Sequence, residues 1–160
     1  MIDAAGRFAE AAAAAGLAPD VRRFPEGTRT ADDAARAVGC DIGQIVKSLV
    51  FVAGNEPVLA LTSGRNRVDP AKLAALCSAP DVRKATADEV RAATGYAIGG
   101  TPPFGHPTRL RCFADPDLMG FDTVWAAAGT PESVFPIGPG ELLRVAGARV
   151  APFTETRPPG

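Results

Sequence analysis

Histidine and cysteine are scarce in this sequence of 160 residues, and their scarcity excludes several kinds of site. The single histidine, His106, cannot build a metal centre of several imidazoles. The three cysteines, Cys40, Cys77 and Cys112, are odd in number and form no C-x-x-C pair, which argues against a disulfide framework and a zinc site. We therefore expect each cysteine to be a small core residue. We expect no metal and no cofactor.

Excess charge and long apolar runs are also absent. The 17 basic and 18 acidic residues give a formal net charge of −1, so the composition is not that of a basic nucleic-acid-binding protein. No run approaches the roughly 18 apolar residues of a membrane-spanning helix. Asp3, Arg7 and Glu10 interrupt the alanine-rich N-terminus, which therefore lacks the apolar segment of a signal peptide. We expect a soluble, cytoplasmic protein with no membrane or DNA partner.

Three common functional motifs are missing. The chain has no G-x-x-x-x-G-K-[ST] phosphate loop, no H-E-x-x-H zinc motif and no G-x-S-x-G nucleophile motif. Residues 95–100, GYAIGG, are distantly similar to a dinucleotide-binding loop. The glycine spacing is wrong, however, and Pro102 and Pro103 would block the helix that receives a pyrophosphate. We therefore reject a dinucleotide site.

Helical and strand-like segments alternate along the chain. Capping residues mark helix starts at Thr30, Asp69 and Thr86. The sequence predicts helices over residues 2–15, 30–38, 69–77, 86–94 and 140–147, and strands over 47–53, 57–62, 109–114, 122–128, 133–137 and 148–153. There is no repeat and no internal linker. This order predicts one mixed α/β or α+β domain over residues 1–153 and a frayed tail over 154–160.

The segment AIGGTPPFGH, residues 97–106, holds three glycines, two adjacent prolines and the only histidine. Glycine lets a backbone approach a ligand closely, whereas Pro102 and Pro103 fix φ and remove two N–H donors. The amides that remain are few and held in place. Such a loop is either a plain turn or a cradle for an oxygen that takes on negative charge.

Three charged features each have two interpretations. Lys47 opens the apolar run KSLVFV and is either a strand-end lysine that reaches water or a fixed cation in a pocket. His106 is either a hydrogen-bonding loop residue or part of a site. Arg65, Arg67 and Lys72 form a loose basic patch, for which a solvated face is the default interpretation.

Two of these segments together resemble a known family. IVKSLVF at residues 45–51, followed about fifty residues later by TGYAIGGTPPFGH, resembles the YbaK family of aminoacyl-tRNA deacylases. These are free-standing relatives of the editing domain in bacterial prolyl-tRNA synthetase. The resemblance covers roughly residues 20–150, with similar segments at TADDAARAVG, ATGYAIGG and GELLRVAGARV. It implies an α+β domain whose central mixed, barrel-like β-sheet is surrounded by helices.

The resemblance also implies a site. In the family the lysine and the Gly-x-x-x-Pro loop, here Gly99 to Pro103, face one another across a pocket for the 3′ acceptor end of charged tRNA. Ester hydrolysis passes through a tetrahedral oxyanion, which the amides of Gly99, Gly100 and Thr101 are implied to stabilise. Lys47 is implied to hold the terminal phosphate or ribose or to stabilise the developing charge. The residues implied to bind substrate are Phe24, Thr30, Pro102, Pro103, Gly105, His106, Ala127 and Val134.

The sequence departs from the cysteine-specific members of that family. They carry a serine and an aspartate where this chain has Ala127 and Val134, which argues against a cysteinyl substrate. We predict a trans-editing hydrolase that removes a mischarged small amino acid from tRNA, with an aminoacyl-tRNA synthetase as a further partner. The attacking group is water or a substrate hydroxyl. The alternative is a non-catalytic module that binds aminoacyl-tRNA or an amino-acid-like ligand. A grip on the acceptor end alone neutralises few phosphates, so the net charge fits either function.

Overall fold

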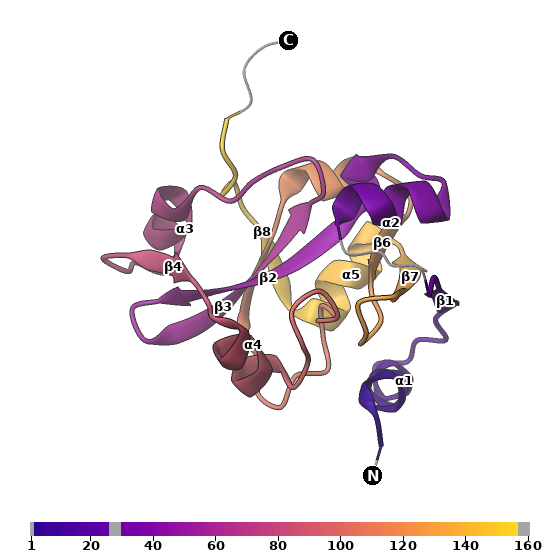
Figure 1. Ribbon diagram of the computed structural model, residues 1–160. Helices are drawn as coiled ribbons and strands as arrows, with labels where there is room; N and C mark the ends of the chain where they lie inside the picture. The colour runs from indigo at the N-terminus through magenta and orange to yellow at the C-terminus, as the bar shows by residue number, and fades with distance from the viewer. Residues whose placement is uncertain (1, 26–29, 157–160) are drawn as a thin grey trace.

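A computed structural model describes residues 2–25 and 30–156 (Figure 1). Its α-helices are α1 (Ala4–Ala14), α2 (Ala31–Val38), α3 (Pro70–Cys77), α4 (Ala87–Thr94) and α5 (Pro139–Ala146), with two 3-10 turns, η1 (Ile42–Gln44) and η2 (Pro116–Gly120). The strands are β1 (Arg22–Arg23), β2 (Val46–Ala53), β3 (Glu56–Ser63), β4 (Val82–Lys84), β5 (Arg111–Ala114), β6 (Val124–Ala127), β7 (Ser133–Ile137) and β8 (Ala148–Val150). All the predicted helices and strands are present, with shifts of a few residues at their ends.

Helix ends follow the capping chemistry that the sequence predicts. The Thr30 hydroxyl accepts a hydrogen bond from the Asp33 amide at the start of α2. Thr86 and Glu89 form a reciprocal capping box at the start of α4. Gly95 ends α4 with a φ of 82°, a left-handed conformation that glycine adopts without strain.

The described strands form two sheets. The larger has the order β4-β2-β3-β5-β8, with β2, β3 and β4 antiparallel and β5 and β8 added in parallel. The smaller is the antiparallel sheet β1-β7-β6. The mixed α+β class is confirmed, but the expected barrel-like sheet is wrong. Among the described residues, a single β-bridge between Ile45 and Trp125 connects the two sheets, so they do not close into a barrel.

Strand β2 has one edge that is only partly covered. It pairs with β3 along its whole length, whereas β4 covers only Phe51–Ala53 on the other side. Beyond that ladder, Val50 accepts a hydrogen bond from the Ala85 amide. Residues 46–49 therefore form no ladder with another strand on this edge within the described chain. The gap between the two sheets opens at these residues.

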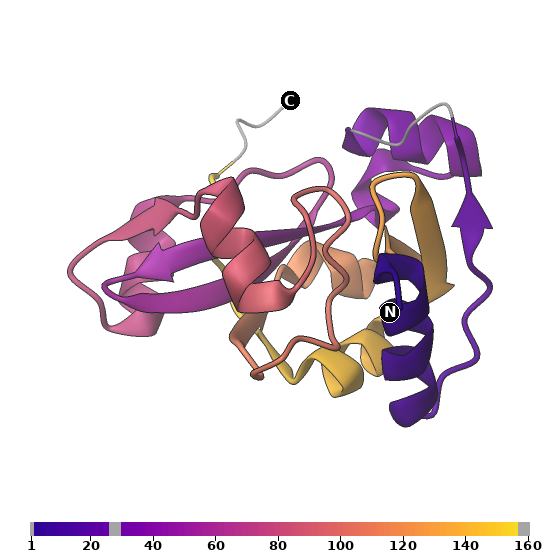
Figure 2. The ribbon, with the colours of Figure 1, turned by 60° about the horizontal axis from the view of Figure 1, so that its bottom comes forward.

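Helix α1 packs against the base of the loop at residues 97–106 (Figure 2). Phe8 is 1% exposed, and its ring centroid lies 5.5 Å from that of Phe104 and 4.9 Å from that of Phe135. Arg7 donates a hydrogen bond to the Gly95 carbonyl and lies over the Tyr96 ring. The N-terminal helix thus holds both ends of the loop.

Several short elements were missed by the sequence analysis. β1, β4, η1 and η2 have two to five residues each, which is too short for a recognisable period. The tail also differs from the expectation. Thr154 pairs with Val68 and accepts a hydrogen bond from Lys72, so residues 154–156 are held; residues 157–160 lie outside the described chain. No described helix is long and apolar enough to cross a membrane.

Candidate active site

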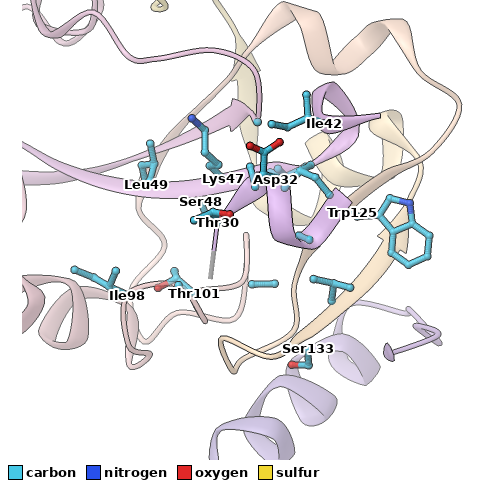
Figure 3. A pocket seen from close by; sticks show the side chains of 18 residues that line it. Thr30, Asp32, Ile42, Lys47, Ser48, Leu49, Ile98, Thr101, Trp125 and Ser133 are labelled. Carbon is cyan, nitrogen blue, oxygen red and sulfur yellow. The ribbon is translucent and has the colours of Figure 1, made fainter. Parts of the chain in front are cut away.

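A cavity of about 490 Å³ lies in the gap between the two sheets (Figure 3). Its walls come from the start of α2, from η1 and the first half of β2, from the loop at residues 98–101, and from β6 and β7. The partly uncovered edge of β2 forms one wall. The cavity therefore exists because the two sheets do not join into a barrel.

Lys47 lines this cavity, and its ammonium is held in place. Nζ donates a hydrogen bond to the Asn66 carbonyl at 2.5 Å, and the side chain extends away from Thr101 in Figure 3. Burial lowers the pKa of Lys47 from 10.5, and the positive charges of Arg67 and Lys84 lower it further, while Asp115 opposes the shift. The side chain is half-buried, so it is neither fully solvated nor buried in the core. The fixed-cation interpretation is the one that this geometry fits.

Two of the three loop residues whose amides were predicted as oxyanion donors lie at the cavity. Gly99 and Thr101 line it, and neither amide donates to an acceptor within residues 2–25 and 30–156. The Gly100 amide instead donates to the Ala97 carbonyl at 3.0 Å, which closes the turn. The prediction of Gly100 as a donor to the cavity is not supported, because its N–H is already used within the turn.

Of the predicted substrate-binding residues, Thr30, Ala127 and Val134 line the same cavity. Phe24 and Pro102 do not. Phe24 packs behind the cavity wall, against the apolar cluster that includes Trp125 and Val134, and its amide donates to the Glu132 carbonyl. These two predicted contacts with substrate have no support in the geometry.

His106 lies outside the cavity, together with Pro103 and Gly105. These three residues line a separate cavity of about 100 Å³ on the side of the loop near α5. His106 Nε2 lies 2.8 Å from the Pro102 carbonyl, and burial lowers the pKa of this imidazole. The alternative interpretation of His106 as a hydrogen-bonding loop residue is the one that fits.

Three polar residues of the cavity were missed by the sequence analysis. Ser48 has a buried hydroxyl with no partner in the described chain. Ser133 lies at the opposite wall, where its hydroxyl pairs with that of Thr130 at 2.7 Å, and Asp32 lies at the rim (Figure 3). Ser48 directly follows Lys47 in β2, but successive side chains of a strand point to opposite faces, so this adjacency gives no local signal.

The cavity is polar at one end and apolar at the other. Lys47 lines one end, and the positive charges of the exposed Arg67 and Lys84, which do not themselves line the cavity, lower its pKa. Trp125 and Val134 line the other end from the smaller sheet, with Ala127 beside them. Such a site suits a ligand with an anionic part and a small apolar part. In the described ranges, no group of three His, Cys, Asp or Glu residues could hold a metal ion.

The chain matches one family model and several known proteins. A family model described as "Aminoacyl-tRNA editing domain" matches residues 25–145. The protein YwhH of Bacillus subtilis, which is uncharacterized, is 30% identical over 132 residues, or 82% of this chain and 83% of that protein. Proline--tRNA ligase of Nitratidesulfovibrio vulgaris is 36% identical over 99 residues, which are 62% of this chain and only 17% of the ligase.

A solved structure extends the similarity over nearly the whole chain. It is described as that of a candidate trans-editing enzyme for prolyl tRNA synthetase. It superposes with a TM-score of 0.91 at 47% identity and covers 98% of this chain and 99% of its own.

Proposed function

Because the chain belongs to the aminoacyl-tRNA editing domain family, we propose that it is a free-standing deacylase that removes a mischarged small amino acid from tRNA. The reaction is hydrolysis of the ester between the amino acid and the terminal ribose. Water adds to the carbonyl carbon, the ester C–O bond breaks, and the free amino acid and the tRNA hydroxyl leave. Charged tRNA is used in translation, which takes place in the cytoplasm, so we place the protein there.

One observation carries the proposal: Lys47, Gly99 and Thr101 line the same cavity, and the two loop amides have no acceptor among the described residues. A tetrahedral intermediate carries its negative charge on the former carbonyl oxygen. Preorganised amides stabilise such an oxygen, and one donor typically contributes about 3–4 kcal/mol. We assign the Gly99 and Thr101 amides to this oxygen.

The polarity of the cavity orients the substrate. The end near Lys47, Arg67 and Lys84 suits the terminal phosphate and ribose of the acceptor end, because backbone phosphates bind lysine and arginine. The end formed by Ala127 and Val134 then receives the amino-acid side chain. No charged side chain lines that end, so it favours a small and weakly polar side chain.

No histidine lines the cavity among the described residues, and Asp32 at the rim is the one carboxylate there. His106, the residue best suited to act as a base by its chemistry, lies in a different cavity. An aminoacyl ester is an activated acyl group, so positioning and oxyanion stabilisation are the main requirements. The attacking group is water or a hydroxyl of the substrate itself.

A panel of mischarged tRNAs tests the function. Alanine, serine, cysteine, valine and phenylalanine are each loaded onto tRNA for proline and onto an unrelated tRNA, and release of the amino acid is followed against the buffer rate. We expect the fastest release from the smallest side chains and a steep loss beyond valine. Tight binding of charged tRNA with no release above the buffer rate would instead establish the non-catalytic binding module.

A synthetase partner is tested separately, by co-sedimentation with prolyl-tRNA synthetase.

A further inference from the structure

Lys47 is the first member of a chain of hydrogen bonds that leads from the cavity into the protein. Its Nζ donates to the carbonyl of Asn66, which is 3% exposed. The Asn66 side-chain Nδ2 donates to Asp115 Oδ2 and to Asp117 Oδ2, at 2.8 Å each. We call these residues the Lys47–Asn66–Asp115 chain. It connects β2 to the turn between β5 and η2, although β3 lies between the two strands.

Asp115 is the fixed end of this chain. Its carboxylate is 1% exposed and accepts hydrogen bonds from the Ser63 amide at 3.1 Å and the Asp117 amide at 3.0 Å, in addition to that from Asn66. The Asp115 amide donates to the Leu61 carbonyl, which extends the pairing of β3 with β5. Donors from three segments thus fix both carboxylate oxygens.

Burial of the Asp115 carboxylate costs desolvation free energy. The hydrogen bonds from three segments and the cap of η2 are its structural role, and its charge has a further effect. Asp115 has an electrostatic effect on the cavity, because its negative charge raises the pKa of Lys47 against the effects of burial, Arg67 and Lys84. The carboxylate therefore favours the charged form of the cavity lysine without touching it.

The orientation of Asn66 follows from its partners. Both Asp115 and Asp117 present acceptor oxygens, so the amide must turn its NH₂ group toward them. This leaves Asn66 Oδ1 buried and without a partner in the described chain. The side chain is thus oriented by two anions even though its own acceptor stays unsatisfied. That orientation fixes the backbone at residue 66, whose carbonyl receives the Lys47 ammonium.

We propose that Asn66 and Asp115 are positioning residues for Lys47, which hold its ammonium at one point of the cavity wall before any ligand arrives. A lysine side chain has four rotatable bonds, and an unanchored ammonium would sample many positions across the cavity. The anchored ammonium loses little entropy when an ester binds. This inference rests on the proposed function only for the identity of the ligand, because the anchoring is a property of the protein alone.

The test compares Asn66→Ala and Asp115→Asn with a matched control, Arg65→Gln. Asn66→Ala keeps the backbone carbonyl that accepts from Lys47 but removes its anchor. Arg65 lies in the same loop, and its side chain pairs with the exposed Asp41 at 2.7 Å. Each variant is first checked by thermal unfolding. The reactivity of Lys47 toward an amine-selective acylating reagent is then measured by mass spectrometry across pH, and deacylation kinetics are measured on the best substrate.

We expect Asp115→Asn to lower the pH at which Lys47 becomes reactive, because the carboxylate that favours its charged form is gone. Asn66→Ala should reduce kcat by about tenfold to a hundredfold, the cost of a misplaced group, with KM changed less than about twofold. Arg65→Gln should match the unmodified protein in both assays.

Folded variants whose Lys47 reactivity equals that of the unmodified protein would overturn the inference. A protein without deacylase activity but with these labelling shifts would overturn the proposed function and support the positioning role. If one of the two variants fails to fold, the labelling profile of the other decides.

Discussion

Gly100 lies so close to the backbone of Thr130 that no side chain fits between them. A Cβ placed on Gly100 would lie 2.9 Å from both Cα and the carbonyl carbon of Thr130. Backbone atoms cannot move aside as a side chain can. The glycine-rich loop is thus fixed against the turn between β6 and β7, which brings Gly99 and Thr101 to the cavity.

Gly100→Ala should therefore displace the loop. We expect kcat to fall by about tenfold or more, because the two oxyanion donors move, and the free energy of unfolding to fall by about 1–3 kcal/mol from overpacking. Deacylation kinetics and urea unfolding measure the two effects. The matched control is Gly140→Ala in α5, where nothing lies within 4 Å of the new methyl group. It should stabilise the helix by about 0.5–1 kcal/mol and leave kcat unchanged. Equal kinetics in the two variants would contradict the role of the loop.

Lys47→Ala should remove most of the activity while the protein stays folded. The side chain lines the cavity and makes one polar contact, so its loss costs the reaction more than the packing. We expect a decrease in kcat/KM of about a hundredfold or more, as for other lost charge-stabilising groups. Lys72→Ala is the control, because Lys72 also donates to a backbone carbonyl, that of Thr154, but does not line the cavity. Unchanged turnover in folded Lys47→Ala would exclude the catalytic assignment.

Ala127→Leu should shift the choice of substrate. The larger side chain fills the apolar end of the cavity, so release of valine should slow more than release of alanine. One methylene group in a hydrophobic pocket changes kcat/KM by about 10–200-fold, and a change of this order in the ratio between the two substrates is expected. The ratio is its own control, since any general loss of folded protein cancels. An unchanged ratio would mean that the amino acid binds at the other end.

Arg67→Ala and Lys84→Ala should weaken the binding of tRNA without changing the choice of amino acid. Each removes one exposed cation beside Lys47. The slope of log affinity against log salt concentration should become shallower by about 0.7 per charge removed, if each residue contacts one phosphate of the single-stranded 3′ end. The measurement uses a tRNA with a non-hydrolysable amide link. Arg149→Ala, on β8 at the opposite edge of the sheet, is the control and should leave the slope unaltered.

Glu89→Gln should reduce stability at neutral pH but not in acid. A hydrogen bond from Arg83, together with the capping box at Thr86, lowers the pKa of Glu89 from 4.5 to about 2. The carboxylate therefore stabilises the fold fully above pH 4.5, and this contribution is lost as the pH falls toward 2. The difference in free energy of unfolding between the unmodified protein and Glu89→Gln should be largest near pH 6 and shrink below pH 4.5. A difference that does not vary with pH would contradict this account of Glu89.

The elements of this fold were predictable because their signals are local. Thr30, Asp69 and Thr86 cap helices through hydrogen bonds to residues two or three positions away, so the sequence alone locates those helix starts. The turn between β2 and β3 is equally local. Lys47 and the glycine-rich loop were also recognisable as a pair of motifs.

Tertiary structure alone decided which of those residues share a cavity. His106 and Thr101 lie five positions apart in one loop, yet they line different cavities because the loop separates the two. The Gly100 amide is not free to bind the oxyanion, because it donates a hydrogen bond to the Ala97 carbonyl. That bond requires one particular turn. In the Lys47–Asn66–Asp115 chain the two hydrogen bonds join residues 19 and 49 positions apart, and no local pattern encodes such pairings. They follow from the order of strands in the larger sheet, which depends on how the whole apolar core packs.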